Sequence, residues 1–532
     1  MIRVRGLRLL PGESEERLRG LAAAALHIPA GELGELTIRK KSLDARRKSN
    51  LHYLYTVDVT VRGDEARILK KADPSRVLPA ELPTYSPPRG FSGTDRPVVT
   101  GFGPAGMFAA LILARAGARP IVLERGWDVE RRRAAVETFW SGGPLEPACN
   151  VQFGEGGAGT FSDGKLNTGI RDPRIPWLLE QMVRAGAPES ILYDARPHVG
   201  TDVLAGMVKN LRQRIMDLGG EIRFGHCMAD LTIRDGRLVA VKVEGPDGAY
   251  DLPCRRLILA TGHSARDTFR MLRSRGVPME PKPFAMGVRI EHRQAAVDRA
   301  QYGDTDLPLP PADYRLAVHL PDGRGAYTFC MCPGGSVVAA ASEHGGVVTN
   351  GMSLSARDGE NANAALLVGV TPADFPSKDV LGGVYWQREL EQRAFEAGGG
   401  NYFAPAQRLE DFLARRPSTG PGTIQPTYRP GVTWCDLHDV LPEHITKTLE
   451  EALPLLERKM AGFTHPDAVL TAVESRSSSP VRVLRDVGGQ SALRGLYPCG
   501  EGAGYAGGIV SAAVDGIRCA EAVLKGESDE HV

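Results

Sequence analysis

The chain lacks the features that would direct it to a membrane or to nucleic acid. Its net charge is only +1, since 65 lysines and arginines face 64 aspartates and glutamates, so no overall field favours an anionic partner. No apolar run approaches the roughly 20 residues of a membrane span. Residues 1–16 lack the continuous apolar core of a signal peptide. We therefore expect a cytoplasmic protein without a membrane span.

Cysteine is scarce and follows no metal-binding pattern. The eight cysteines stand at positions 149, 227, 254, 330, 332, 435, 499 and 519. No C-x-x-C pair occurs, and Cys330-x-Cys332 alone is not a metal site. We expect no bound metal, and thiols that stay reduced as in the cytosol.

A glycine turn between two short apolar strands stands out within residues 96–126. A predicted strand at 97–100 precedes Gly101-Phe102-Gly103-Pro104-Ala105-Gly106, and an apolar helix and a second strand, 120–123, follow. This is the setting in which G-x-G-x-x-G binds a dinucleotide. Glu124 lies where an acid accepts hydrogen bonds from ribose hydroxyls. The alternative, a purely structural glycine turn, leaves Glu124 unexplained.

Each residue of this turn has an expected task. Gly101 permits the tight turn, Gly103 lets the backbone approach a pyrophosphate, and Gly106 lets helix and strand pack closely. Pro104 suits the first helical turn, where a missing N–H costs little. Ala105 follows it, and the helix N-terminus offers free N–H groups and a partial positive charge to the phosphates.

Residues 1–95 precede this unit and predict a small α+β domain that ends in a proline-rich linker, 72–95. Strands are expected over 2–10, 36–40 and 53–61, and a helix over 14–25. Residues 39–48 hold six basic residues. They indicate either a nucleic-acid patch or a solvated hairpin or basic rim facing the next domain. We favour the second because no aromatic residues interleave with the basic ones.

Further glycine-rich segments follow. Residues 150–168 hold four glycines within six positions, and ordering such a loop is justified by close approach to a flat ligand. A strand at 257–260 leads into Ala260-Thr261-Gly262. Near the C-terminus, a short strand leads into Gly500-Glu501-Gly502 and then into a helix beginning near Gly508. The segment between these, 281–475, predicts mostly strands.

Together these motifs resemble FAD flavoproteins of the glutathione-reductase-type FAD/NAD(P)-binding superfamily. The marks are GFGPAG at 101–106 with Glu124, ATG at 260–262 and GEGAGYAGG at 500–508. The resemblance is closer to the uncharacterised bacterial FAD-dependent dehydrogenases, through KKSLDAR at 40–46, GEGGAGTFSDGKLNT at 154–168 and ESRSSSPVR at 474–482. It covers essentially the whole chain.

The resemblance implies an α/β fold in four segments. A small N-terminal α+β domain (1–95) precedes a Rossmann-like FAD-binding domain built from 96–280 and 476–532, into which a mostly-β cap or substrate domain (281–475) is inserted. This insertion lacks the second G-x-G-x-x-G of disulfide reductases, so NAD(P)H is left open as a transient donor. The C-x-x-x-x-C pair of those enzymes is missing from the sequence too, which disfavours dithiol chemistry.

The resemblance also implies non-covalent FAD held by a defined set of residues. The pyrophosphate, ribose, adenine, ribityl chain and flavin ring are expected to meet Gly101, Gly103, Pro104, Ala105, Gly106, Glu124, Arg125, Gly157, Gly159, Thr160, Ser162, Asp163, Lys165, Met228, Thr261, Gly262, Gly500, Glu501, Gly507, Gly508 and Ile509.

The catalytic candidates are His344, Glu343, Arg289 and Arg476. His344 carries an imidazole, the type of side chain suited to act as an acid or base in proteins, although an ordinary loop histidine is the alternative. The two arginines suit bidentate anchoring of a carboxylate, or pairing with a structural acid. Lys165 and Glu474 are further candidates for proton transfer.

Three functions stay open. The first is an FAD-dependent reductase or dehydrogenase that transfers hydride between flavin N5 and a small organic substrate. The second is an electron-transfer flavoprotein reduced by a partner protein docked on the N-terminal domain. The third is an RNA-binding redox sensor, supported only by the basic segment 39–48. The sequence leaves the substrate, the electron donor, the direction of reaction and the oligomeric state undetermined.

Overall fold

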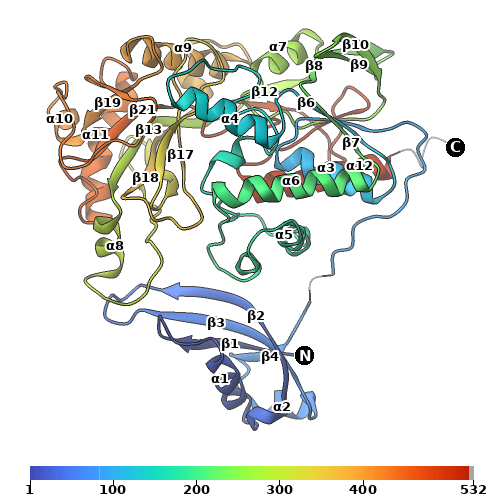
Figure 1. Ribbon diagram of the computed structural model, residues 1–532, viewed down its shortest axis with the longest axis vertical. Coiled ribbons are helices and arrows are strands. Elements are labelled where there is room, and N and C mark those ends of the chain that lie inside the picture. Colours follow the sequence, from blue (N-terminus) through green and yellow to red (C-terminus); the bar gives the residue numbers. More distant parts are fainter. Residues whose placement is uncertain (83, 527–532) are drawn as a thin grey trace.

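The computed structural model describes residues 1–82 and 84–526. Figure 1 shows an N-terminal domain below two larger units that lie side by side. The N-terminal domain is an antiparallel sheet of order β2-β3-β1-β4 packed against two helices. Its elements are β1 (Ile2–Leu9), α1 (Arg17–Leu26), β2 (Leu33–Asp44), β3 (His52–Val61), α2 (Glu65–Lys71) and β4 (Val77–Pro79). The segment expected to be only a linker thus contains a strand, because Val77 can pair with β1 and bury its side chain.

The second unit is built around a five-stranded parallel sheet of order β23-β11-β5-β6-β7. The strands are β5 (Val98–Thr100), β6 (Ile121–Glu124), β7 (Glu221–Phe224), β11 (Leu257–Leu259) and β23 (Leu496–Pro498). An antiparallel meander of β8 (Cys227–Arg234), β9 (Arg237–Gly245) and β10 (Gly248–Pro253) is attached. The outer helices are α4 (Val129–Trp140), α5 (Arg174–Arg184), α6 (Thr201–Asp217) and α7 (Arg266–Ser274).

Helix α3 (Pro104–Arg115) lies at the centre of this unit. All its residues from Ala105 to Ala114 are buried, since the helix is apolar around its whole circumference. It packs against the sheet, against α6 and against the final helix α12 (Ile509–Lys525). The contact with α12 is close, because a Cβ on Gly516 would lie 2.1 Å from the Ala105 carbonyl oxygen. The chain therefore returns to its first βαβ unit at its end, as the α/β prediction requires.

The third unit is a seven-stranded, mostly antiparallel sheet of order β14-β15-β18-β13-β21-β19-β20. Strands β13 and β18 are almost entirely buried along ten residues each, so both faces of the sheet are covered. The strands are β13 (Phe284–Arg293), β14 (Ala317–His319), β15 (Gly325–Cys332), β18 (Asn361–Val370), β19 (Ala404–Arg408), β20 (Val432–Trp434) and β21 (Val469–Glu474). This confirms the α/β fold class with an inserted, mostly-β unit.

Helices and two small sheets complete the third unit and its junction with the second. The helices are α8 (Gln294–Tyr302), α9 (Gly382–Ala397), α10 (Leu409–Leu413) and α11 (Glu443–Lys459). The two-stranded sheets are β16 (Ser336–Ala339) with β17 (Thr349–Met352), and β12 (Met279–Pro281) with β22 (Val481–Val483). In Figure 1, α11 lies at the left of the large sheet and α9 runs along the top of this unit. No helix among residues 1–82 and 84–526 combines the length and apolarity needed to cross a bilayer.

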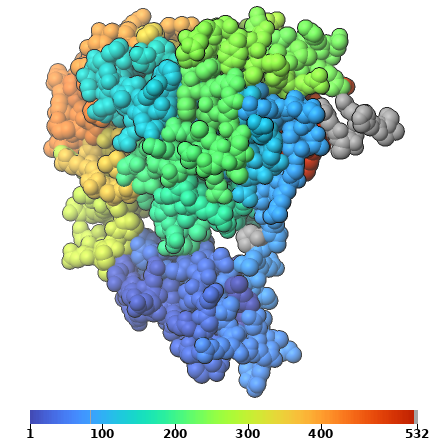
Figure 2. Space-filling view, turned by 45° about the vertical axis from the view of Figure 1, so that its right-hand side comes forward, coloured from blue at the N-terminus to red at the C-terminus, as the bar shows by residue number. Residues whose placement is uncertain are grey.

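The N-terminal domain contacts the second unit through its longest hairpin. The Lys41 N–H donates to the Tyr193 carbonyl at 2.8 Å, and the Ala195 N–H donates to the Lys41 carbonyl at 2.8 Å. Figure 2 shows this domain, in blue, in contact with the green middle segment of the chain. Within the basic segment, the ion pairs are Arg39 with Asp58, Lys41 with Glu15 and Arg46 with Asp44. Three of its six basic side chains thus form ion pairs with acids of the N-terminal domain itself.

Candidate functional site

A cavity of about 980 Å³ lies between the second and third units. One wall comes from the loops after the parallel strands β5, β6 and β11, which is where open α/β sheets bind ligands. The opposite wall comes from β15, β17 and the end of β21. The N-termini of α3 and α12 both open into it. Two helix N-termini facing one cavity favour an anionic ligand.

The first glycine turn builds the floor of the cavity. Gly101 adopts φ +89°, and a Cβ there would lie 2.3 Å from the Ala260 carbonyl oxygen, so the turn needs glycine. The backbones at Gly103 and Gly157 meet directly, because a Cβ on Gly157 would lie 3.0 Å from the Gly103 Cα. The two glycine-rich segments that the sequence singled out therefore form one cradle.

Glu124 closes this cradle from the side. Its carboxylate accepts backbone N–H groups from Phe102 at 2.8 Å, Gly126 at 2.9 Å and Gly154 at 2.9 Å. The residue is buried, yet it lines the cavity. A carboxylate has about four acceptor positions, so one remains for a ligand hydroxyl beside the three structural bonds.

Glu501 and His263 present polar groups to the cavity. The Glu501 Oε1 lies 3.6 Å from His263 Nδ1. Burial raises the pKa of Glu501 to about 7, and burial together with Arg476 lowers the pKa of His263 to about 4. The His263 Nε2 is buried and has no hydrogen-bond partner among the described residues. Both side chains are suited to bind polar groups of a ligand.

Most of the expected cofactor-binding residues line this cavity. They are Gly101, Gly103, Pro104, Ala105, Glu124, Arg125, Gly157, Gly159, Ser162, Lys165, Met228, Thr261, Gly262, Glu501, Gly507, Gly508 and Ile509. Gly106, Thr160, Asp163 and Gly500 lie outside this lining set. Gly106 serves packing, since a Cβ there would lie 1.9 Å from the Gly101 carbonyl oxygen. Asp163 pairs with Lys165 and Arg357.

The two candidate arginines are occupied by protein partners. Arg289 is fully buried, donating to Glu474 Oε2 at 3.0 Å, to Asn363 Oδ1 at 3.0 Å and to the Cys330 carbonyl at 2.9 Å. Arg476 lines the cavity, but its guanidinium donates twice to Glu391, at 2.8 and 2.9 Å. Each arginine therefore pairs with an acid of the protein: Arg476 with the buried Glu391, and Arg289 with Glu474, which lines the cavity.

The other two catalytic candidates lie outside the cavity wall. Glu343 accepts a hydrogen bond from Arg266 at 2.7 Å, and His344 is exposed on a turn. Neither residue belongs to the lining of the cavity. Of the remaining candidates, Lys165 and Glu474 do line it.

Sequence reasoning missed the role of Arg132 in the charged helix α4. In a helix so rich in charged residues, an arginine is expected to face solvent. It is instead fully buried, and it donates to the carbonyls of Asn150 (2.9 Å), Val151 (2.9 Å) and Glu155 (2.6 Å). One guanidinium thereby holds the second glycine-rich loop against helix α4.

A buried network joins the two large units and was also missed. Glu391 on α9 accepts from Arg266 on α7 at 2.8 and 2.9 Å and from Arg476. Burial alone would raise the pKa of Glu391, but the two arginines lower it to about 2. The three residues come from segments far apart in the sequence, so the sequence offered no signal beyond the presence of one acid and two arginines.

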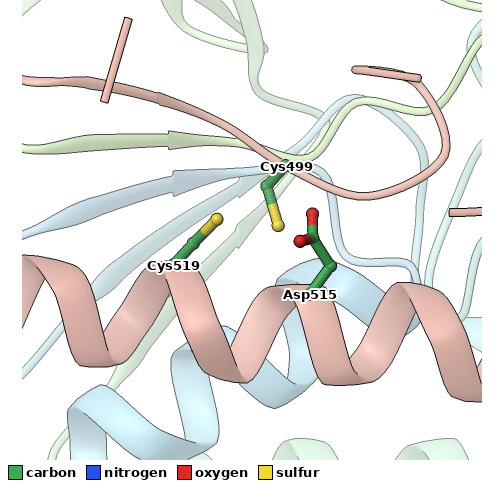
Figure 3. Close-up of side chains that lie close together, drawn as sticks. All are labelled: Cys499, Asp515 and Cys519. Atoms are coloured by element: carbon green, nitrogen blue, oxygen red, sulfur yellow. The ribbon is translucent and has the colours of Figure 1, made fainter. Parts of the chain in front are cut away.

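One cluster resembles a metal site in composition. Figure 3 shows Cys499, after β23, pointing toward Asp515 and Cys519 on α12, and their ligand atoms lie within 4.8 Å of one another. However, Arg485 donates to Asp515 Oδ1 at 2.6 Å and to Cys519 Sγ at 3.4 Å. The Gly500 N–H donates to the same carboxylate at 2.7 Å. A guanidinium thus already supplies the positive charge there, and the cluster ties β23 to α12.

The groups around the cavity fit FAD. The glycine cradle at Gly103 and Gly157 leaves room where a larger side chain would intrude, and two helix N-termini face it. Glu124 keeps one acceptor position, His263 Nε2 has no hydrogen-bond partner among the described residues, and the half-buried Glu501 carboxylate faces the cavity. These features suit a long ligand that has phosphates at its middle and hydroxyls on both sides.

Comparisons with known proteins agree with this fit. Residues 283–477 match the family described as FAD-dependent protein, C-terminal domain-like, and residues 1–60 match a domain of unknown function. An uncharacterized protein of Clostridium beijerinckii is 45% identical over 532 residues, covering 98% of each chain. Digeranylgeranylglycerophospholipid reductase 2 of Methanopyrus kandleri is 27% identical over 205 residues, which cover 38% of this chain and 45% of that protein.

Solved structures with a similar arrangement include a triple mutant of the flavin-dependent brominase Bmp2. It is 15% identical, with a TM-score of 0.37 over 81% of this chain and 80% of that chain. A geranylgeranyl bacteriochlorophyll reductase-like protein from Thermoplasma acidophilum is 13% identical, with a TM-score of 0.36 over 80% and 77% of the two chains.

Proposed function

The chain belongs to the family of the Clostridium beijerinckii protein and carries the C-terminal domain of FAD-dependent proteins, and from this premise we propose that it is an FAD-dependent oxidoreductase acting on a small organic molecule. The observation that carries the proposal is the convergence of α3 and α12 on one cavity whose other wall belongs to that C-terminal domain. The arrangement provides a cofactor side and a substrate side within a single chamber.

The proposed FAD contacts follow from the groups that line the cavity. Gly103 and the N-terminus of α3 take the pyrophosphate, Glu124 takes the adenosine ribose, and the Met228 backbone takes the adenine. Glu501 takes ribityl hydroxyls, and the α12 N-terminus at Ile509 lies by the flavin ring. When bound, non-covalent FAD supplies hydride transfer at N5.

The substrate side of the cavity is formed by β15, β17 and β21. Thr328, Thr349 and Asn350 offer polar groups there, and Glu474 and Lys165 are its ionisable groups. Arg289 orients the Glu474 carboxylate, to which Thr349 also donates at 3.3 Å. We assign Arg289 and Arg476 positioning roles, and we assign proton transfer to the lining groups Glu474 and Lys165 instead of Glu343 and His344.

A glycine variant tests whether the cavity holds FAD. At Gly103 a Cβ would contact only the Gly157 backbone, at 3.6 Å or more, so Gly103→Val leaves the fold intact while its methyl groups enter the cradle. We expect colourless Gly103→Val protein from cells that yield yellow wild type, measured by flavin absorbance. Gly206→Val, on an exposed position of α6 with open space around it, is the control. Equal flavin content in wild type and Gly103→Val would contradict the proposal.

Anaerobic mixing with NADPH or NADH identifies the electron donor. A dinucleotide-binding domain is built on a parallel sheet of several strands. Among the described residues, the five-stranded sheet is the one such sheet, so they contain no second domain of this kind. NAD(P)H would then bind transiently at the same cavity. Rapid bleaching of the flavin by one nucleotide would establish a nicotinamide-driven reductase. Absence of bleaching by both would favour an electron-transfer flavoprotein reduced by a partner protein, or reduction by the substrate itself.

A further inference from the structure

A β-bulge in β15 directs a cysteine into the cavity. Phe329 pairs with Ala365 and Cys332 pairs with Asn363, so three steps on β15 match two steps on β18. Bulges of this kind re-aim side chains and are frequent beside active sites. Within the bulge, Cys330 adopts φ +42°, a left-handed conformation uncommon for a residue with a side chain. Its half-buried side chain lines the cavity.

Two cations hold the bulge in this conformation. Arg289 donates to the Cys330 carbonyl at 2.9 Å, and Lys165 donates to the Met331 carbonyl. Strained backbone persists where its surroundings over-determine it, and it clusters at functional sites. The carbonyl contacts therefore place the Cys330 side chain beside Arg289 and Lys165, within a cavity that also contains proposed FAD contacts.

The second cysteine lies immediately behind the first. The Cys332 thiol donates to the Cys330 carbonyl at 3.2 Å, and Cys332 is fully buried. Residues two apart have Cα atoms at most roughly 7 Å apart, close to the 4.4–6.8 Å or so that disulfides span. Cys332, which lies behind the cavity wall, is therefore close enough to bond to Cys330 Sγ.

The surroundings activate Cys330 and leave Cys332 protonated. The neighbouring Cys332 thiol, together with Arg289 and Lys165, lowers the pKa of Cys330 below its usual value. The carboxylates of Asp163, Glu474 and Glu501 face Cys330 and act to raise its pKa. Their effect is smaller than that of the groups that lower it. The contact with Cys330 raises the pKa of Cys332. An accessible thiolate with a protonated neighbour is the arrangement of reactive cysteine pairs.

We propose that Cys330 and Cys332 form a thiol–disulfide exchange site that opens into the cavity and takes a small organic disulfide as its substrate. The Cys330 thiolate attacks one sulfur of R–S–S–R, which forms a Cys330–S–S–R bond and releases RS⁻. The released thiolate takes the Cys332 proton and leaves as RSH. The Cys332 sulfur then attacks Cys330 Sγ and expels the second RS⁻, which takes its proton from solvent, so the protein dithiol is oxidised and the disulfide is reduced to two thiols.

This site deepens the proposed function, since it rests on that function for repeated turnover. FAD held by the residues of this cavity would, once reduced, supply the two electrons that restore the dithiol. A single round of exchange needs no flavin chemistry, so the thiol site can be tested separately from cofactor binding.

The test treats full-length protein, purified with its bound FAD, with 2-hydroxyethyl disulfide. Both cysteines lie on one tryptic peptide, residues 325–357, so mass spectrometry reads their state directly. In wild type we expect this peptide to lose two hydrogens and become unreactive to alkylation. In Cys332→Ser we expect a stable mixed disulfide at Cys330, and in Cys330→Ser neither product. Cys435→Ser, outside the cavity, is expected to behave as wild type.

A second measurement on wild type needs no variant to fold. Iodoacetamide at about pH 6 is expected to label Cys330 and to spare Cys435, whose pKa burial raises to about 11. Unlabelled Cys330, or a wild-type mixed disulfide that never resolves, would overturn the exchange site. Flavin absorbance is recorded on each sample. A colourless protein that still forms the Cys330–Cys332 bond would refute the proposed function and leave the exchange site standing.

Discussion

The carboxylate of Glu124 accepts the backbone N–H of Gly154 at 2.9 Å, and this bond joins the end of β6 to the loop that covers the cavity. The same carboxylate holds the first glycine turn through the Phe102 N–H. Glu124, which the sequence motif assigns to a ribose, therefore also holds two loops together by hydrogen bonds. Its replacement should affect the protein even before any cofactor binds.

Glu124→Ala is expected to destabilise the cofactor-free protein. Three buried N–H groups would lose their acceptor, at about 1–3 kcal/mol for each group left unsatisfied. We expect a fall of about 3 kcal/mol or more in the free energy of unfolding, measured with urea. Glu180→Ala, at an exposed position of α5, is the matched control. If both variants unfold at the same urea concentration, the hydrogen bonds of Glu124 have no energetic role.

Glu391→Gln is expected to loosen the junction between the two large units. Removing the charge of Glu391 takes that acid away from the buried Arg476 and leaves Arg266 with Glu343 as its remaining acid, and breaking a buried ion pair costs about 3–5 kcal/mol. The pKa of Glu391 is lowered to about 2 in the folded protein. Its ionised carboxylate therefore contributes its full stabilisation at any pH above the pKa of an unfolded glutamate, and this contribution is lost as pH falls through about 2. The difference between variant and wild type should therefore be full at pH 7. Glu389→Gln, exposed on the same helix, should leave thermal unfolding unchanged.

Glu501→Gln is expected to change the pH dependence of stability in the cofactor-free protein. A carboxyl pKa raised to about 7 means that the folded state holds an extra proton between the unfolded-state pKa and about pH 7. Stability therefore falls as pH rises through this window, by up to about 3 kcal/mol. Glu501→Gln should lack this fall in stability with rising pH, and it should therefore be more stable than wild type at pH 8. Urea curves at pH 5 and pH 8 measure it, and parallel pH profiles of the two proteins would reject it.

Gly516→Ala is expected to separate α12 from α3. The added Cβ would lie 2.1 Å from the Ala105 carbonyl oxygen, so the helices must move apart, at a cost of about 1–3 kcal/mol. Because both helix N-termini line the cavity, FAD affinity should fall as well, by roughly tenfold or more, as measured by flavin fluorescence. Gly206→Ala, in an exposed helix position, should instead stabilise slightly. Unchanged affinity in Gly516→Ala would show that the crossing tolerates the methyl group.

The local parts of the fold were predictable because short-range spacing encodes them. The turn at Gly101, the helix after it and the acid at Glu124 lie within one βαβ unit, and each has a steric or hydrogen-bonding reason for its position. The start of α12 near Gly508 followed from a glycine turn and an apolar helix. A strand hidden in the proline-rich segment 72–95 was missed, since β4 depends on pairing with β1.

The long-range contacts were not predictable from one sequence. Nothing near Glu391 indicates that it pairs with Arg266 and Arg476 from other segments. Arginines in a charged helix are mostly exposed, so the burial of Arg132 contradicts the usual expectation. His344 attracted attention by its chemistry alone, whereas its exposed turn outside the cavity depends on the tertiary fold.

The order of the strands in the parallel sheet has a consequence for biosynthesis. Strand β5 leaves the ribosome early, but its sheet is completed by β23 and covered by α12, which are made last. At about 5–20 residues per second, the interval between β5 and α12 is about 20–80 s. During that interval the nascent chain has no complete cradle, whereas the N-terminal domain already has all its strands. Cofactor capture is therefore expected only after α12 has been made, and chains that terminate before α12 should emerge without flavin and become targets for proteolysis.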